Sequence, residues 1–307
     1  MRRLLPLMLL AALMLLDLCA GHGFHWTGGV LLWKLRLPRM LTAAVAGAAM
    51  ALSGAQMQAL FRNPLADPHI MGVSGGAGLG ASLAALALGG SGWAGGISLV
   101  GAAFAGALFS ALLVVAAAAR VQRSGTLLLA GVMLGFVFSA LSSVLQYSAG
   151  EESLKLFYSW MAGSFSHVRY SALLSMFLAL VLGFALAIRH IKSLDLLLFG
   201  DSFSLFSGLP LKRVRRQLML GCALMTGAVT AFCGPVGFIG IAAPHIVRRS
   251  RGTAAHAVVI PWSAVYGACL ALAGDILAHI GTPLPVGSTL ALIGVPLILW
   301  LLWKERM

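Results

Sequence analysis

The chain has 307 residues, of which 60% are hydrophobic and only 9% are charged. Soluble domains carry roughly 25% charged residues, so this composition excludes an ordinary soluble domain and predicts an integral membrane protein. The formal net charge of +13 could suggest nucleic-acid binding, but the basic residues stand in short clusters between long apolar runs. That distribution is the positive-inside pattern of a membrane protein rather than a basic nucleic-acid-binding stripe.

The first apolar run, residues 4–16, follows a basic pair at the amino terminus. A signal peptide is the alternative, but no A-x-A cleavage site follows, and a lipoprotein signal would need a small residue in place of Leu18. We therefore predict a first membrane span with the amino terminus inside. Asp17 is interpreted as a residue of the outer membrane interface, followed by an outer loop at 22–33.

A proline-containing stretch at 61–80, FRNPLADPHIMGVSGGAGLG, joins a second span at 40–61 to a third that ends near residue 90. Pro64 stops the first helix because proline lacks an N–H donor. Asp67 followed by Pro68 is typical of a helix N-cap and first turn. The stretch therefore predicts a tight polar elbow between two membrane helices.

Beyond the elbow, Gly72, Gly76 and Gly80 recur every four residues. They predict a helix face that packs closely on another membrane helix. Residues 72–76 also match a nucleophile elbow, and 76–81 match a loose dinucleotide fingerprint, but both motifs require a preceding strand. A proline-terminated loop precedes them here, so helix packing is the better interpretation.

Further apolar runs predict span four at 93–119, span five at 126–149 and span six at 171–188. Residues 151–163 carry Trp and Tyr and are too short to span, which predicts an interfacial helix. Residues 189–216 form the longest polar interruption and are flanked by six basic residues, so they are predicted to be cytoplasmic. Within them, 194–207 has the length of one or two short helices that end at Leu209-Pro210.

The apolar stretch 218–247 lies between two basic clusters, 212–216 and 248–251. A single span would place these clusters on opposite sides of the membrane, against the positive-inside rule. A hairpin broken at Gly234-Pro235 keeps both inside, but its halves of about 22 Å are shorter than the roughly 30 Å hydrocarbon core. Broken helices are tolerated where protein buries them or where they line a cavity, so we predict the hairpin with its break near the pore.

Spans at 257–276 and 286–302 complete ten predicted spans with both termini cytoplasmic. The predicted fold class is all-α, with residues 1–307 forming a single transmembrane domain. The basic residues that then fall outside are Lys34, Arg36, Arg39, Lys155 and Arg169. The four cysteines, Cys19, Cys222, Cys233 and Cys269, stand singly without metal-site spacing, so we interpret them as packing residues and predict no metal.

Four motifs in this order resemble the permease family of ABC importers for iron–siderophores, haem and cobalamin. They are RLPR at 36–39, FRNPLADPHIMGVSGGAG at 61–78 with Gln58 before it, GPVGFIGIAAPHIVR at 234–248 and LPVGSTLALIGVPLILWLL at 284–302. The similarity covers essentially the whole chain. It implies a bacterial inner-membrane permease that forms a homodimer, or a pair of related permeases, with the pathway at the dimer axis. It also implies a cytoplasmic ATPase dimer, which would hold ATP and Mg, and a periplasmic binding protein.

By this resemblance, the cytoplasmic segment at about 194–211 holds the coupling helices that dock the ATPase. The matching positions are Gly200, Asp201, Ser202, Ser204, Leu205, Ser207 and Gly208. The family form has Gly-Glu, Ala-Arg and Leu-Gly pairs in this segment. Here the first pair is Gly200-Asp201, in which the acid is one methylene shorter. The other two pairs are replaced by Ser204-Leu205 and Ser207-Gly208. These differences imply a partner specific to this chain.

The resemblance also places Arg36 and Arg39 on the outer face, as rim charges that in the cobalamin member receive acidic residues of the binding protein. A third arginine of that set falls at His279. Because neutral histidine offers no ion pair, this contact is expected to be weaker or pH-dependent.

Pathway linings in the family are largely apolar or small. Residues that fit this description, although ordinary core residues would look the same, are Met133, Phe136, Ser139, Ser142, Ser143 and Met161. The cargo stays open among iron–siderophore, haem and cobalamin. Iron chelates, including haem, rank first because they form the broader part of the family.

We predict an ATP-driven import permease rather than an enzyme. The chain has no Walker A motif, so hydrolysis is assigned to a partner and no cofactor is expected on this chain. An ion-gradient-driven secondary transporter is the alternative, but it would need ionisable residues deep in the spans, and Asp17 and Asp275 stand near span ends. A membrane enzyme built on His245 is a third possibility, but no Ser, Asp or Glu nearby completes a site.

Overall fold

The computed structural model describes residues 4–19, 29–88, 92–121, 124–166, 168–280 and 284–305. The regular secondary structure within these ranges is helical throughout, which confirms the all-α fold class. The predicted outer loop at 22–33 lies largely outside the described residues, and so do both chain ends.

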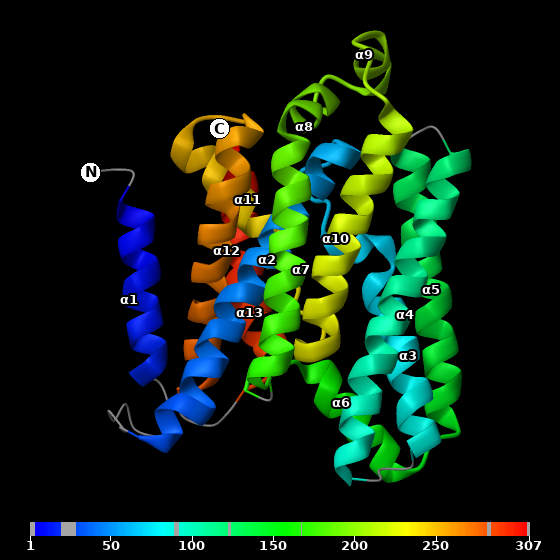
Figure 1. Cartoon of the computed structure of the whole chain (residues 1–307), viewed down its shortest axis with the longest axis vertical. Coiled ribbons are helices and arrows are strands. Elements are labelled where there is room, and N and C mark those ends of the chain that lie inside the picture. The colour runs from blue at the N-terminus through cyan, green and yellow to red at the C-terminus, as the bar shows by residue number, and fades with distance from the viewer. Residues whose placement is uncertain are drawn as a thin grey trace.

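The helices form one elongated bundle, with α8 and α9 at one end and α6 toward the other (Figure 1). In chain order the elements are α1 (Leu5–Cys19), the π-helical turn η1 (Leu32–Arg36), α2 (Leu37–Phe61), the 3-10 turn η2 (Pro68–Met71), α3 (Val73–Leu88), α4 (Gly92–Arg120), α5 (Ser124–Tyr147), α6 (Glu151–Ala162), α7 (Tyr170–Arg189), α8 (Ile191–Leu197), α9 (Asp201–Phe206), α10 (Leu211–Cys233), α11 (Ile239–Arg251), α12 (His256–Ala278) and α13 (Val286–Glu305).

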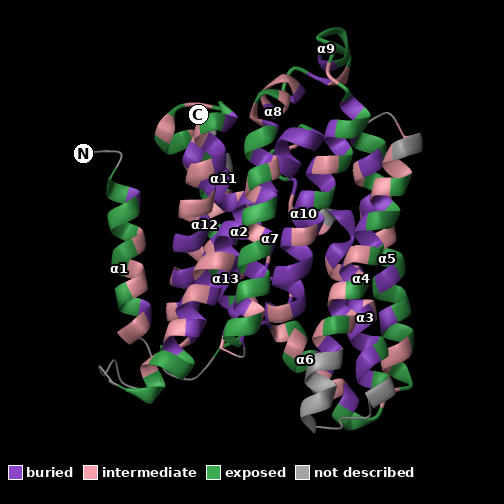
Figure 2. Cartoon of the chain, viewed as in Figure 1, coloured by how far each residue is buried: buried purple, intermediate pink, exposed green. Residues whose placement is uncertain are grey.

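The centre of the bundle is the crossing of α2 with α12. Every residue from 46 to 61 of α2 is buried, as its purple colour in Figure 2 shows. The two helices approach through small residues: a Cβ on Gly47 would lie 2.2 Å from the carbonyl oxygen of Gly267, and one on Gly267 would lie 2.3 Å from that of Gly47. Membrane helices associate through such close backbone packing because lipid provides no hydrophobic drive between them.

The elbow between α2 and α3 has the predicted chemistry. Arg62 closes α2 in the left-handed conformation, with φ 50°. The Asp67 carboxylate accepts a hydrogen bond from the backbone N–H of His69 (2.9 Å), so it is an N-cap, here of the short turn η2. In α3 and α4, a Cβ on either Gly76 or Gly106 would lie within 2.4 Å of the other residue's carbonyl oxygen. This contact confirms that the glycine face packs on a neighbouring helix.

The chain reverses between α10 and α11 at residues 234–238, as the predicted hairpin requires. His256, just after α11, contacts Asp195 of α8, so α11 returns the chain to the end where α10 begins (Figure 1). The prediction of two short helices is wrong for α10. This helix includes the basic residues 212–216 and has 23 residues, about 35 Å, because Lys and Arg are good helix formers. Lys212, Arg213 and Arg216 are exposed, while Arg215 is buried.

Six helices within the described ranges are long and apolar enough to cross a membrane, and three shorter apolar helices accompany them. Together with the short α11, they correspond to the ten predicted apolar segments. The multi-pass organisation is confirmed, while the number of crossings stays a prediction. α6 is the separate short helix expected at 151–163, and its Trp160 indole donates to the carbonyl oxygen of Ala231 (3.0 Å).

Candidate coupling site and outer arginine cluster

α8 and α9 form the projecting end of the molecule (Figure 1). α8 is seated in the bundle, since Leu194 and Leu197 are fully buried and the helix packs on α2 and α12. α9 stands further out and packs on α8 and α10. The prediction of one or two short helices at 194–207 is confirmed, with two helices of which α8 begins three residues earlier, at Ile191.

Three of the predicted coupling residues shape this segment from within. Ser204 is fully buried, and its hydroxyl lies 3.0 Å from the carbonyl oxygen of Leu196 and 2.8 Å from that of Gly200. Gly200 and Gly208 have φ values of +105° and +79°, a region that favours glycine. These residues therefore set the path of the chain between α8 and α10.

The exposed side of the segment is aromatic. Ser202, Leu205 and Ser207 are exposed as expected, but the side chains that reach furthest are Phe199, 72% exposed, and Phe206, 93% exposed. Exposed aromatic clusters beside polar residues are typical of protein interaction sites. Sequence reasoning missed these phenylalanines, although their recurrence in a polar segment was an available signal.

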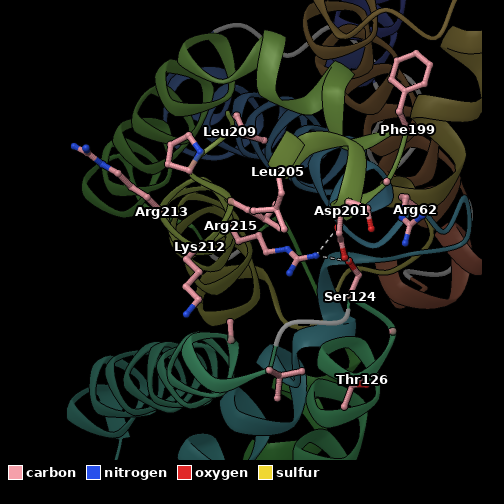
Figure 3. Close-up of a pocket in the computed structure, with 17 residues that line it drawn as sticks. Arg62, Ser124, Thr126, Phe199, Asp201, Leu205, Leu209, Lys212, Arg213 and Arg215 are labelled. Atoms are coloured by element: carbon pink, nitrogen blue, oxygen red, sulfur yellow. Dashed lines mark hydrogen bonds and ion pairs between the residues drawn. The ribbon is translucent and has the colours of Figure 1, made fainter. Parts of the chain in front are cut away.

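Asp201 makes its polar contacts with its own bundle (Figure 3). Its Oδ1 pairs with Nη2 of Arg215 in α10 at 2.7 Å, and its Oδ2 accepts a hydrogen bond from Oγ of Ser124 at 3.0 Å. Arg215 also donates to the Ser124 hydroxyl, and both of these residues are buried. The three side chains join α9 to the first residue of α5 and to the second turn of α10.

A pocket of about 1040 Å³ opens beside this cluster. Its wall contains the Asp201 cluster, the apolar side chains of Leu205 and Leu209, and further positive charge from Arg62, Lys212 and Arg213 (Figure 3). The lining carries the positive charges of Arg62, Lys212, Arg213 and Arg215 against the single carboxylate of Asp201, which favours an acidic ligand.

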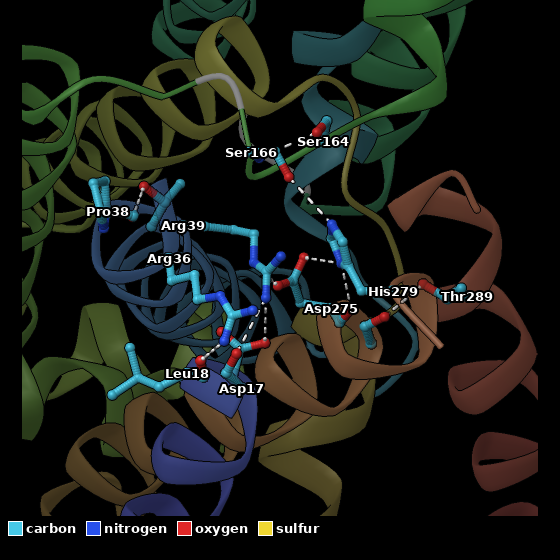
Figure 4. A network of polar contacts seen from close by, with 12 residues as sticks. Asp17, Leu18, Arg36, Pro38, Arg39, Ser164, Ser166, Asp275, His279 and Thr289 are labelled. Carbon is cyan, nitrogen blue, oxygen red and sulfur yellow. Dashed lines mark hydrogen bonds and ion pairs between the residues drawn. The ribbon is translucent and has the colours of Figure 1, made fainter. Parts of the chain in front are cut away.

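At the opposite end of the bundle, Arg39 of α2 lies between two buried carboxylates (Figure 4). Its Nε is 3.0 Å from Oδ2 of Asp275 in α12, and its Nη2 is 3.7 Å from Oδ1 of Asp17 in α1. The interpretation of Asp17 as an interface residue is wrong, since its side chain is fully buried beside Arg39. Burial of charged groups requires such pairing, and sequence position alone did not reveal the partner.

Arg36 and His279 belong to the same cluster. Arg36 donates to the carbonyl oxygen of Leu18 (2.9 Å), and Arg39 donates to that of Asp17 (3.1 Å), so both arginines cap the carboxyl end of α1. His279 Nδ1 lies 2.8 Å from the carbonyl oxygen of Asp275. The structure brings the three predicted docking residues together, but Arg36 and Arg39 are each only 8% exposed and are not free rim charges. Their docking role stays a prediction.

The predicted pathway residues fall into two groups. Met133, Phe136, Ser139 and Ser143 of α5 are exposed, as is Met161 of α6. Ser142 is buried instead, and its hydroxyl contacts Ser82 and the carbonyl oxygen of Gly78 in α3. It lies half a turn around α5 from Met133. Ser142 therefore belongs to the α3–α5 contact, and the pathway role of all six residues stays a prediction.

Comparison with known proteins matches nearly the whole chain. The FecCD transport family model matches residues 9–304. The vitamin B12 import system permease protein BtuC of Salmonella paratyphi A is 39% identical and covers 99% of this chain and 95% of its own length. BtuC of Klebsiella pneumoniae is 38% identical, with 97% and 92% covered.

Solved structures agree with this result. A metal-chelate type ABC transporter in an inward-facing conformation superposes with a TM-score of 0.88 at 28% identity, covering 97% of each chain. PsaBC from Streptococcus pneumoniae, in complex with Fab, superposes with a TM-score of 0.57 at 17% identity over 89% of this chain and 91% of that chain, which shows a shared fold only.

These matches identify the class of protein as a transport permease. Its coupling segment is the projecting α8–α9 end in the resemblance described above. The chain belongs to the FecCD transport family, the permeases of ABC importers.

Proposed function

We propose that this permease moves a metal chelate across the bacterial inner membrane into the cytoplasm, with cobalamin as the first cargo to test. The observation that supports cobalamin is the 39% identity, over nearly the full length, to permeases named for vitamin B12 import. Family breadth alone ranks iron chelates first among the cargoes. An iron chelate is kept as the second candidate because the solved metal-chelate type transporter is 28% identical.

A partner ATPase is proposed to drive transport by docking on α8 and α9. The exposed Phe199 and Phe206 offer apolar anchors of the kind that dominate binding energy. The neighbouring basic pocket offers charge complementarity to an acidic segment of that partner. ATP and Mg would bind to the partner, and hydrolysis there would supply the free energy.

At the other end, a periplasmic binding protein is proposed to deliver the cargo near Arg36, Arg39 and His279. A second copy of this chain is proposed to complete the pathway, with Met133 and Phe136 of α5 directed toward it. These side chains are exposed on the single chain, which leaves them available to a second subunit.

The test is uptake by proteoliposomes that contain the permease, its ATPase and its binding protein. We expect ATP-dependent uptake of radiolabelled cobalamin, and no uptake of ferric siderophore or haem above background. Uptake of an iron chelate without cobalamin would transfer the assignment to the second candidate. If an ion gradient drives uptake of cobalamin, ferric siderophore or haem in the absence of ATP, the result would support a secondary transporter instead.

The docking surface is tested by one matched pair of variants. Phe206→Ala should weaken association of the ATPase by about tenfold or more, the usual effect of removing a binding hot spot. Phe177→Ala removes an aromatic side chain of α7 that is 48% exposed and remote in sequence from the coupling segment. It should leave association unchanged, and equal losses in the two variants would exclude α9 as the specific docking surface.

A further inference from the structure

Two carboxylates attach the α8–α9 end to different transmembrane helices. Asp195 of α8 contacts the start of α12, and Asp201 of α9 contacts the start of α5 and the second turn of α10. Neither contact could be predicted from the sequence, because the partners are 61 residues from Asp195 and, for Ser124, 77 residues from Asp201.

The Asp195 contact has the geometry of a helix cap supplied by a different helix. Its Oδ1 accepts the backbone N–H of His256 (2.8 Å) and the Nδ1–H of the same residue's ring (2.7 Å). His256 is the first residue of α12, where backbone N–H groups have no partner within the helix and a negative charge is favourable. The His256 ring is fully buried, and its Nε2 has no hydrogen-bond partner among the described residues. Asp195 therefore orients this ring.

The Asp201 contact is a three-way cluster in which Arg215 and Ser124 are buried and Asp201 is half-buried. The Asp201 carboxylate bonds both Arg215 and Ser124, and Arg215 also donates to Ser124. Charge-assisted hydrogen bonds of this kind are roughly twice as strong as neutral ones. The Asp201 side chain therefore links α9 both to the first residue of α5 and to α10.

α8 and α9 are also joined to each other. The Ser204 hydroxyl of α9 lies 3.0 Å from the carbonyl oxygen of Leu196 in α8, and the rings of Phe199 and Phe203 are 5.3 Å apart. The two helices therefore form one unit that has two polar attachments to the bundle in addition to the apolar packing of α8 on α2 and α12.

We propose that Asp201 and Asp195 are positioning residues that carry a displacement of this unit to two sets of helices, Asp201 to α5 and α10, and Asp195 to α12. The source of the displacement rests on the proposed function, in which an ATPase docks on α9. The attachments themselves do not depend on it. Asp201 is thus assigned to transmission within the permease rather than to contact with the partner.

Hydrogen exchange on the purified full-length permease in lipid nanodiscs tests the attachments without any partner. Asp201→Asn should speed amide exchange about tenfold at 124–130 and 211–217, while 256–262 stays within about twofold of the wild type, because loss of a charge-assisted contact promotes local opening. Asp195→Asn should give the reverse pattern. Ser202→Ala, which changes an exposed neighbour of Asp201, should change neither region. General destabilisation would speed exchange in all regions, so equal patterns in the two Asp variants would overturn the proposal.

The transmission step is tested in the reconstituted transporter by the ratio of cargo imported to ATP hydrolysed. Asp201→Asn should lower this ratio by about tenfold while association of the ATPase stays unchanged, and Asp201→Glu should recover part of the loss. A fall in association instead would assign Asp201 to the docking surface and overturn transmission. If the wild-type permease binds no ATPase at all, the proposed function fails. The exchange pattern still tests whether Asp195 and Asp201 attach α8 and α9 to the bundle.

Discussion

Gly54 of α2 meets the backbone of α11 with no room for a side chain. A Cβ at this position would lie 2.0 Å from the carbonyl oxygen of Gly240. One turn further along, the Gln58 amide donates to the same oxygen at 3.2 Å, and Arg248 donates to the Gln58 side-chain oxygen at 2.6 Å. The close approach thus brings α11, which is too short to span alone, into hydrogen-bonding reach of α2.

We expect Gly54→Ala to lower the free energy of unfolding by about 1–3 kcal/mol, the usual cost of overpacking a core. The obstacle is backbone rather than a flexible side chain, so α11 must shift. Thermal unfolding in detergent measures the loss. Gly101→Ala in α4 is the matched control, because nothing lies within 4 Å of a Cβ there. Equal destabilisation by both substitutions would contradict this account.

Spacing along the chain predicted one glycine face but not the other. Gly72, Gly76 and Gly80 recur within a single segment, so their shared face could be predicted from helical periodicity. Gly54 and Gly240 come from helices far apart in the sequence, and no local pattern pairs them. The same limit explains why the contacts of Asp201 and Asp195 were missed while the segment that carries them was identified.

α1 packs on α12, and polar contacts at its carboxyl end add to this attachment. Arg36 and Arg39 bond the last carbonyl oxygens of this helix, and Arg39 also pairs with Asp17 and Asp275. Hydropathy correctly predicted α1 as a helix. It could not predict that Asp17 is buried, because a carboxylate near a span end is equally compatible with an interface.

We expect Arg39→Gln to destabilise the permease more than Arg36→Gln. The first variant leaves two buried carboxylates without their guanidinium, which typically costs about 3–5 kcal/mol. The second removes the guanidinium that bonds the Leu18 carbonyl oxygen, and a hydrogen bond to a charged group contributes about 1.5–3 kcal/mol. Denaturant unfolding of the two variants provides the comparison. Adding Asp17→Asn to Arg39→Gln should recover part of the loss, whereas a larger effect of Arg36→Gln would refute the assignment.

At the scale of the whole molecule, apolar runs and basic clusters were sufficient to predict the all-α bundle, the elbow and the reversal between α10 and α11. Each of these depends on local composition. The polar composition of 212–216 predicts a loop, but these residues form the first turns of α10. The burial of Arg36 and Arg39 was missed because it depends on the packing of α1, α2 and α12 together.

The arrangement of charge predicts which end of the bundle faces the cytoplasm. Arg213, Arg215 and the basic end of α11 share one end with α9, and α6 lies toward the other (Figure 1). The positive-inside rule assigns the first end to the cytoplasm. A cysteine introduced at Thr253, just beyond α11, should therefore resist a membrane-impermeant thiol reagent added to intact cells, while one at Glu152 in α6 should react.

Native cysteines that could react with the reagent must first be replaced. Cys222, Cys233 and Cys269 are buried, but Cys19 is only partly buried and is replaced by serine in the background. Thr253→Cys should react once the membrane is permeabilised, which shows that protection in intact cells reflects sidedness rather than burial. The same reagent should label Glu152→Cys before and after permeabilisation. Because α11 returns the chain to the end where α10 begins, labelling of Thr253→Cys from outside would place that whole end, with α8 and α9, outside the cell and would contradict the predicted orientation.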